Sequence, residues 1–282
     1  MALVKAPRTV AAAVVLLVTV SAHAQWLNTP TPGIPRLADG KPNLAAPAPR
    51  SPDGKPDLSG LWATPCLDCG PTRRQFFDIT LNLKPGEAVM TTWAAAIQKQ
   101  RESREHVDDP FGYCLPPGVP RIHFVIGAYR IISNPQVTAF LHETAAGWIF
   151  RQVFTDGRSM PAVTEPSWLG YSVGRWDGET FVVESAGFKD RGWLDTQKGR
   201  PHSDALRVTE RFRRRDFGHI DLAITIDDSK AFVKPFTITT ELTYQADTEL
   251  LESFCDNHEK SMEHRRIDPA PPEPPSPPRP AP

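Results

Sequence analysis

A glutamate interrupts an apolar row in the segment Pro201–Asp216, whose sequence is PHSDALRVTERFRRRD. In an extended strand, side chains alternate between faces, so Glu210 shares one face with Leu206, Val208 and Phe212. A carboxylate that faces a core is costly unless it is paired or neutralised, and burial raises the pKa of an unpaired carboxyl group. Glu210 is therefore predicted to act as a general acid or base near neutral pH.

The loop before this strand supplies a second candidate for proton transfer, His202, next to Ser203. Ser203 lacks the Gly-x-Ser-x-Gly turn that exposes a hydrolase nucleophile, so a serine hydrolase is not predicted. In the catalytic interpretation Glu210 and His202 move protons, while Arg175 or Arg158 stabilises developing negative charge. The alternative interpretation makes Arg175 the ion-pair partner of Glu210 inside a barrel, with a structural role.

Two other segments place a polar side chain on a strand face with aromatic or aliphatic ones. In an extended strand Gln152 shares one face with Trp148 and the phenylalanines of 148–155. By the same alternation His123 shares a face with Tyr129. Apolar walls with a few placed polar groups are typical of small-molecule sites. The predicted ligand-binding residues are His123, Tyr129, Gln152, Trp148 and Arg158.

The sequence lacks the motifs that metal, nucleotide and nucleic-acid binding would require. The sequence has no His-x-His, no HExxH, no second CxxC and no Gly-rich phosphate loop, so no metal and no cofactor are predicted. The basic run 211–215 alternates, which directs Arg211 and Arg213 outward and Phe212 inward. Because the formal net charge is −1, we interpret this run as an ion-paired surface and predict no nucleic-acid partner.

The first 24 residues are typical of a secretory signal peptide. Lys5 and Arg8 precede the apolar run 10–20, which is too short to span a bilayer, and the small-residue pattern Ala22-His23-Ala24 follows. We expect cleavage after Ala24 and a location in the periplasm or outside the cell. No later stretch of the sequence is long and apolar enough to predict a membrane-spanning helix.

Four cysteines, an even number in an exported chain, indicate disulfides with three possible connectivities. The preferred pairing is Cys114 with Cys255 and Cys66 with Cys69. Redox or zinc chemistry at the Cys66-x-x-Cys69 motif is disfavoured, because no thioredoxin-like pattern surrounds it.

The periodicity predicts a mainly β protein. Short strand-like segments alternate with turn signals such as Asp177-Gly178. One helix is predicted over 85–105, since Pro85 suits a first helical turn and apolar residues follow at helical spacing. A long meander closes to remove its open edges, so we expect an antiparallel, lipocalin-like barrel with one packed helix. The expected strands are 57–63, 121–133, 137–144, 148–155, 168–177, 179–187, 205–215, 219–227 and 235–246.

The predicted organisation has one folded domain, at 57–266. A proline-rich extended arm precedes it at 25–56 and contains a short repeat, with Arg36–Leu44 recurring as Arg50–Leu58. Residues 267–282 are almost all Pro, Ala, Glu and Arg, which predicts a solvated or disordered tail.

A set of motifs resembles a family of exported bacterial proteins that has no established general function. The resemblance runs from about Asp53 to Asn257, and two positions differ from the pattern it implies, Tyr171 and Met160, where histidines would be expected. Gly60-Leu61-Trp62 is similar to the opening Gly-x-Trp of lipocalin-like (calycin) barrels, which implies an interior cavity for a small ligand. The motifs are DGKPDLSGLW, CLPPGVPR, DGR, GRWDGET and PHSDAL.

These observations lead to an expected function and two alternatives. The first is an exported enzyme, a lyase, isomerase or hydrolase, that uses acid–base chemistry on a partly hydrophobic or carbohydrate-like metabolite. The second is a non-catalytic binding protein for a small-molecule ligand. The third is a cell-envelope interaction protein that uses its proline-rich ends as contacts.

Overall fold

The computed structural model describes most of the folded domain and the arm before it. The expected signal peptide, Trp148 and the pair Cys66 and Cys69 lie outside the described residues. The described residues are 29–64, 78–125, 127–144, 149–162, 165–253, 255 and 275–277.

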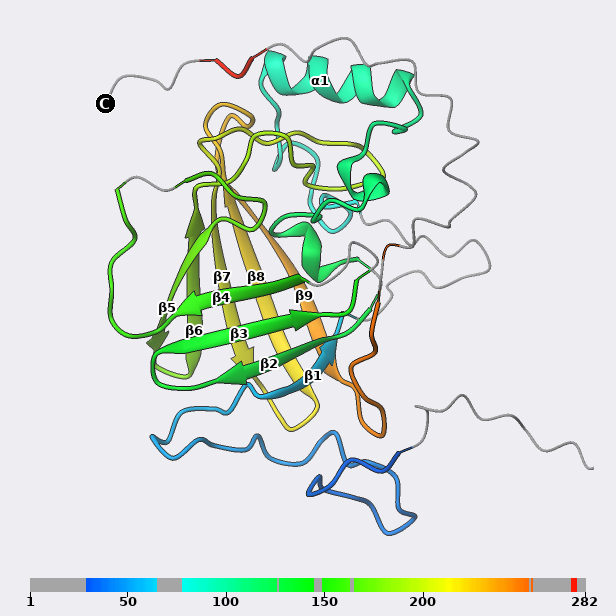
Figure 1. Ribbon diagram of the computed structural model, residues 1–282, viewed down its shortest axis with the longest axis vertical. Helices are drawn as coiled ribbons and strands as arrows, with labels where there is room; N and C mark the ends of the chain where they lie inside the picture. The colour runs from blue at the N-terminus through cyan, green and yellow to red at the C-terminus, as the bar shows by residue number, and fades with distance from the viewer. Residues whose placement is uncertain are drawn as a thin grey trace, which may run out of the picture.

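The chain folds into a closed barrel of nine strands that pair in chain order, with β9 returning to pair with β1 (Figure 1). This confirms the prediction of a mainly β barrel with one packed helix. The strands are β1 Gly60–Ala63, β2 Tyr129–Ser133, β3 Val137–His142, β4 Ile149–Phe154, β5 Tyr171–Asp177, β6 Thr180–Ala186, β7 Arg207–Arg214, β8 His219–Asp227 and β9 Phe236–Tyr244.

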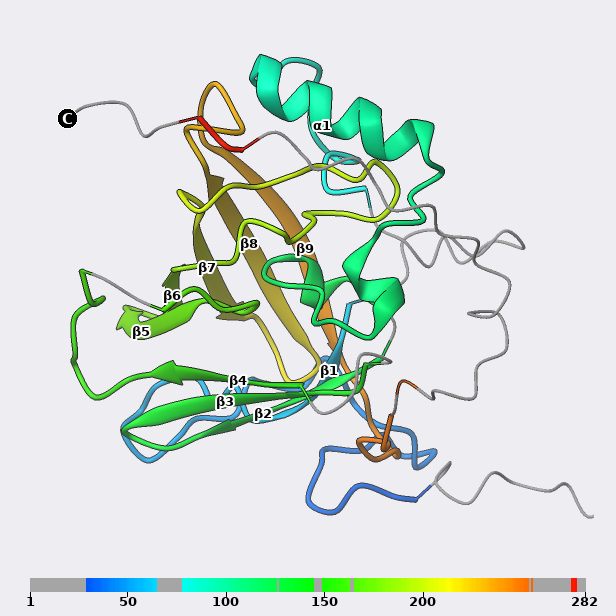
Figure 2. The ribbon, with the colours of Figure 1, turned by 45° about the horizontal axis from the view of Figure 1, so that its top comes forward.

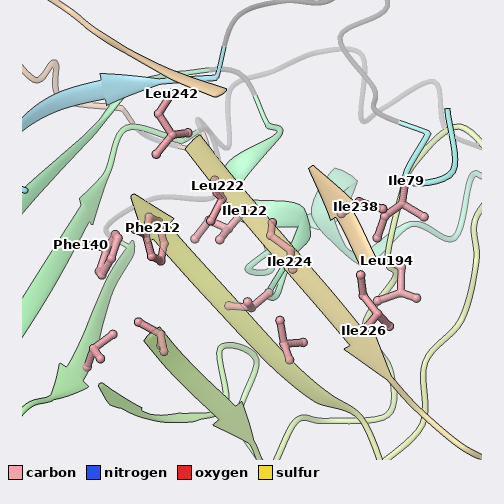
Figure 3. Close-up of a cluster of buried hydrophobic side chains, with 14 of the residues drawn as sticks. Ile79, Ile122, Phe140, Leu194, Phe212, Leu222, Ile224, Ile226, Ile238 and Leu242 are labelled. Atoms are coloured by element: carbon pink, nitrogen blue, oxygen red, sulfur yellow. The ribbon is translucent and has the colours of Figure 1, made fainter. Parts of the chain in front are cut away.

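Strict alternation along β7 and β8 builds much of the core. On β7, Val208, Glu210 and Phe212 are buried, while Arg211 and Arg213 are exposed. On β8 every second side chain is an aliphatic residue that is almost fully buried. These side chains pack against others from the far side of the barrel (Figure 3). The labelled members of this cluster are Ile79, Ile122, Phe140, Leu194, Phe212, Leu222, Ile224, Ile226, Ile238 and Leu242.

One joint of the barrel departs from the antiparallel meander that was predicted. β4 and β5 run parallel and pair only at Phe154 and Val173. The absence of a side chain at Gly174 permits this contact, because a Cβ there would lie 2.8 Å from Val153 Cγ1 and 2.6 Å from Phe181 Cζ. The two strands diverge away from this point (Figures 1 and 2). A single backbone pairing therefore joins β4 to β5 in the barrel wall, and the two strands are unpaired beside it.

Helix α1, Thr92–Ser103, lies over one end of the barrel (Figure 1) and is shorter than the predicted 85–105. Thr91 caps it by accepting a hydrogen bond from the Ala94 amide at 3.3 Å. Just before the cap, Met90 forms a β-bridge with Phe232, so this part of the chain is extended. The helix begins where that pairing ends and not at Pro85.

The predicted strand 121–133 is also too long. Residues Arg121–His123 form a 3₁₀ helix, η2, and β2 begins only at Tyr129. Pro116, Pro117 and Pro120 come just before this turn, and proline lacks the amide hydrogen that strand pairing needs. A second 3₁₀ helix, η1, covers Pro110–Tyr113.

The repeated arm sequence forms two equivalent loops, each closed by a β-bridge. In each loop the leading arginine donates a hydrogen bond to the carbonyl oxygen of the loop glycine. The same guanidinium also pairs with a carboxylate of the barrel domain, Arg36 with Asp247 at 2.5 Å and Arg50 with Glu179 at 2.8 Å. The arm is thus fastened to the barrel at two places.

A disulfide joins Cys114, next to η1, to Cys255 beyond β9, with a Cα–Cα distance of 5.6 Å. The preferred pairing of these two cysteines is confirmed. Across the described part of the chain, α1 included, no helix combines the length and the apolar character that crossing a bilayer requires.

Candidate functional site

A buried ion pair lies at the centre of the barrel. Glu210 projects inward from β7 and is fully buried. Arg151 on β4 donates hydrogen bonds to both of its carboxylate oxygens, with the Nη1–Oε1 distance at 2.9 Å. His123 Nε2 lies 2.5 Å from Oε1, and because a carboxylate only accepts, this ring nitrogen carries the hydrogen. Glu210 is thus held by a cation and an imidazole.

This pairing reverses the expected pKa shift of Glu210. Burial by itself raises the pKa, but the charge of Arg151 and the hydrogen bonds from His123 and Arg151 outweigh it, and the pKa falls to about 2. The expectation of a raised pKa is therefore wrong. Glu210 is an anion at neutral pH, suited to orienting its partners and not to donating a proton.

The sequence interpretation also assigned the wrong arginine to Glu210. Arg175 lies on the outside of β5 and pairs with Glu184 at 3.1 Å, with both side chains largely exposed. Its neighbours Ser172 and Gly174 occupy the inward positions, which leaves Arg175 facing solvent. The interior partner is Arg151, which we did not predict. The pattern that could have predicted it is Ile149-x-Arg151-x-Val153, in which an arginine lies between two aliphatic residues on the other face of the same strand.

Two predicted ligand-binding residues, His123 and Tyr129, do come together. The Tyr129 hydroxyl lies 3.2 Å from His123 Nδ1, although His123 belongs to η2 and not to the strand of Tyr129. Burial, assisted by the charge of Glu210, raises the pKa of Tyr129 well above its usual value. The chain of contacts Arg151–Glu210–His123–Tyr129 forms one network inside the barrel, which we call the interior network.

An additional histidine borders the interior network. The ring of His142 on β3 lies 4.8 Å from that of Tyr129, centroid to centroid. Burial, together with the charges of His123 and Arg151, lowers the pKa of His142 well below its usual value, so the ring is neutral. Its Nε2 atom is buried and has no hydrogen-bond partner among the residues that the structure describes.

The other predicted residues lie outside the interior network. Gln152 points outward, because Ile149, Arg151 and Val153 occupy the inward face of β4, and it lines the cleft described below. His202 is buried against the ring of Phe188, and burial lowers its pKa. Among the contacts described for His202, none reaches Glu210, so the two are not brought together as a proton-transfer pair.

A cleft opens where β4 and β5 diverge. Its volume is about 480 Å³. Residues of β4, of β5 and of the segment 167–169 line it. The walls are mainly apolar, and one wall residue, Phe150, leaves 60% of its surface exposed. The wall side chains used below are Phe150, Phe154, Trp168, Leu169 and Tyr171.

The floor of the cleft connects directly to the interior network. Arg151 and Ser172 are among the residues that border the cleft, and both are almost fully buried beneath it, at 2% and 1% exposed. Arg151 Nε donates to Ser172 Oγ at 3.2 Å, and its Nη2 donates to Ser185 Oγ at 2.8 Å, while the other side of the guanidinium holds Glu210. A molecule in the cleft would therefore lie one side chain away from Glu210.

The predicted ligand-binding residue Arg158 lies at the rim of this cleft. Its guanidinium is 3.9 Å from the ring centre of Phe154 and donates a hydrogen bond to the Tyr171 hydroxyl at 3.1 Å. The rings of Phe154 and Tyr171 stack at 5.2 Å. Tyr171, one of the two positions where the resemblance would lead us to expect a histidine, belongs to the cleft wall.

Comparison with known proteins gives no relative from which a role is transferred. The chain matches no protein-family model, and no curated protein or solved structure is significantly similar to it. Within the described ranges, no group of three His, Cys, Asp or Glu side chains is placed to hold a metal ion. The candidate site is therefore defined by its geometry: an open, mainly apolar cleft with Gln152 on its wall and Arg151 and Ser172 buried beneath it.

Proposed function

We propose that this protein binds a small amphipathic molecule in the cleft between β4 and β5. The observation that carries the proposal is the cleft itself, whose volume of about 480 Å³ lies within the range of small-ligand sites. Aromatic walls suit an apolar body, and the exposed amide of Gln152 suits a polar end. The exposed ring of Phe150 acquires a role as a ligand contact.

A lateral site also fits the packing of the barrel interior. Phe140, Phe181 and Phe212 pack together there, with the ring centres of Phe140 and Phe212 5.7 Å apart. Barrels with few strands are commonly filled by their own side chains in this way. The opening beside the β4–β5 contact offers a ligand space that the axis of the barrel does not.

Acid–base catalysis remains a second proposal, supported by the contact that joins Arg151 on the cleft floor to Glu210. In this version the Glu210 carboxylate fixes the orientation of the His123 ring by accepting a hydrogen bond from its Nε2. The low pKa of Glu210 makes it a positioning group, which separates this proposal from one in which Glu210 itself donates a proton.

The test is ligand screening with variants of the cleft wall. Phe150→Ala and Trp168→Ala are compared with the matched control Ile132→Ala, whose parent side chain is exposed on β2 outside the cleft. We expect an aromatic ligand that raises the melting temperature of the parent protein to bind about tenfold more weakly to both cleft variants and unchanged to the control.

Equal binding by all four proteins would contradict the cleft as the site. Chemical analysis of each bound compound after incubation separates the two proposals. Recovery of unchanged ligand supports a carrier, whereas conversion that is lost in His123→Gln supports an enzyme.

A further inference from the structure

We infer that the ligand of the cleft is a short, uncharged peptide in an extended conformation, which binds by adding a strand to the free edge of β4. The inference rests on the binding proposed above and names the ligand class of that site. It follows from the direction of the backbone groups of β4, from the cleft that makes them accessible and from the pairing of the charges around it.

The backbone groups of Phe150 and Gln152 point away from β3. In an antiparallel pair only alternate residues exchange hydrogen bonds with the partner strand. Just after β4, the Thr155 amide donates to the Gln136 carbonyl at 2.8 Å. Counting back along the register from this pair, residues 153, 151 and 149 bond to β3. The N–H and C=O groups of the residues between them therefore face the β5 side of the strand.

On that side β4 has a free edge. Phe154 pairs with Val173, and no further backbone pairing joins β4 to β5 among the described residues. The strands diverge before this point (Figure 2), and no bond within the described ranges reaches the backbone groups of Phe150 or Gln152. A strand edge with unpaired N–H and C=O groups is a template for another strand, and several peptide-binding domains use such an edge.

The cleft makes this edge accessible and places aromatic side chains beside it. Phe150 and Gln152 both line the cleft and are exposed, Phe150 at 60% of its surface. Phe150, Gln152 and Phe154 share the outer face of β4. Alternate side chains of an added strand would lie next to them, at the distance of cross-strand neighbours. Trp168 lines the cleft as well. A peptide with aromatic residues at alternate positions fits this surface.

The charges around the cleft are paired or screened, which favours an uncharged ligand. Arg158 at the rim is held by Asp156 at 2.6 Å, and Arg151 beneath the cleft is held by Glu210. Lys189 lies over the ring of Trp168 but is exposed, where solvent screens its charge. Backbone amides, which carry no net charge, match the free groups of β4 without disturbing these pairs.

A capped tetrapeptide with alternating side chains, acetyl-Phe-Thr-Phe-Thr-amide, tests the inference by calorimetric titration into the parent protein. Two analogues carry backbone N-methyl groups, one on its first and third residues and the other on its second and fourth. Because only alternate residues of an added strand bond to β4, we expect one analogue to bind roughly tenfold more weakly and the other within about twofold of the unmethylated peptide. Equal binding by the two analogues would overturn strand addition.

Two variants of Gln152 separate the backbone from the side chain. Gln152→Pro removes the N–H that points into the cleft and leaves the bonds to β3 in place, whereas Gln152→Ala keeps this N–H and removes the side-chain amide. We expect Gln152→Pro to weaken peptide binding roughly tenfold and Gln152→Ala by less than about threefold, because an exposed side-chain hydrogen bond contributes little. Equal weakening would show that the side chain, and not the strand edge, binds the peptide.

The aromatic probe 2-naphthol, which has no amide group, separates failure of the inference from failure of the binding function. If 2-naphthol binds, Phe150→Ala weakens its binding and the peptide does not bind, the inference fails while the cleft remains a ligand site. If neither compound binds, the proposed binding function fails as well. The methylated peptides are compared on the parent protein, so their result stands even where Gln152→Pro does not fold.

Discussion

Arg151 and Glu210 form a two-point ion pair across the inside of the barrel, between strands β4 and β7 that are not neighbours in the sheet. The pair ties the β2–β3–β4 part of the wall to the β5–β9 part. It does so near the one joint where these parts share only a single backbone pairing, Phe154 with Val173. A side-chain contact thus supplements the weak backbone connection at this joint.

Removing one member of this ion pair should destabilise the fold far more than replacing both members with apolar residues. Removing one partner of a buried ion pair leaves an uncompensated charge, so Arg151→Met and Glu210→Leu should each lower the free energy of unfolding by about 3–5 kcal/mol. The double variant should recover much of that loss, because neither charge remains. Urea unfolding of the four proteins measures the coupling, and additive losses would show that the two residues act independently.

The low pKa of Glu210 predicts a loss of stability in acid. A carboxyl group with a folded pKa of about 2 and an ordinary unfolded pKa near 4.5 stabilises the fold fully above the unfolded value. This contribution declines as the pH falls from about 4.5 toward 2. We therefore expect the parent protein to lose more stability over this interval than the Arg151→Met/Glu210→Leu double variant. Parallel pH profiles from thermal melts would contradict the assignment.

His142 is expected to destabilise the empty protein. Its buried Nε2 finds no hydrogen-bond partner in the described part of the chain, and leaving such an atom unpaired costs about 1–3 kcal/mol. Its folded pKa is depressed below that of an unfolded histidine, so the unfolded chain takes up a proton first as the pH falls below about 6.5. His142→Phe should therefore raise the free energy of unfolding at pH 7, and by a larger margin at pH 5. A variant that is less stable at both values would indicate that His142 has a structural partner.

Much of the fold was predictable because local patterns and tertiary structure agree. On β7 and β8 each inward position is apolar, apart from Glu210 and the terminal Arg214, so alternation assigned the faces correctly. The closed barrel followed from the series of short strands. The parallel β4–β5 contact was not predictable in the same way, because it depends on a long connection that is not a hairpin and on the space left by Gly174.

The candidate site was predicted only in part, and the errors have a common cause. Aromatic residues normally face a core, but Phe150 and Phe154 face the cleft, so counting aromatics reversed the faces of β4 and concealed Arg151. His123 was placed beside Tyr129 by assuming a strand, whereas a 3₁₀ turn brings it there. The partner of Glu210 lies 59 residues away in sequence, and no local pattern specifies such a pairing.

The two loops of the arm have a consequence for the order in which the molecule is completed. Arg36 is held by Asp247, which lies 211 residues later in the chain. Synthesis runs from the N-terminus, so this partner of Arg36 is made only after β9. The second anchor of the arm, Glu179, is available sooner, 129 residues after Arg50. The two ion pairs of the arm thus require different lengths of chain, and a chain that stops short of Asp247 lacks the partner that fastens its first loop.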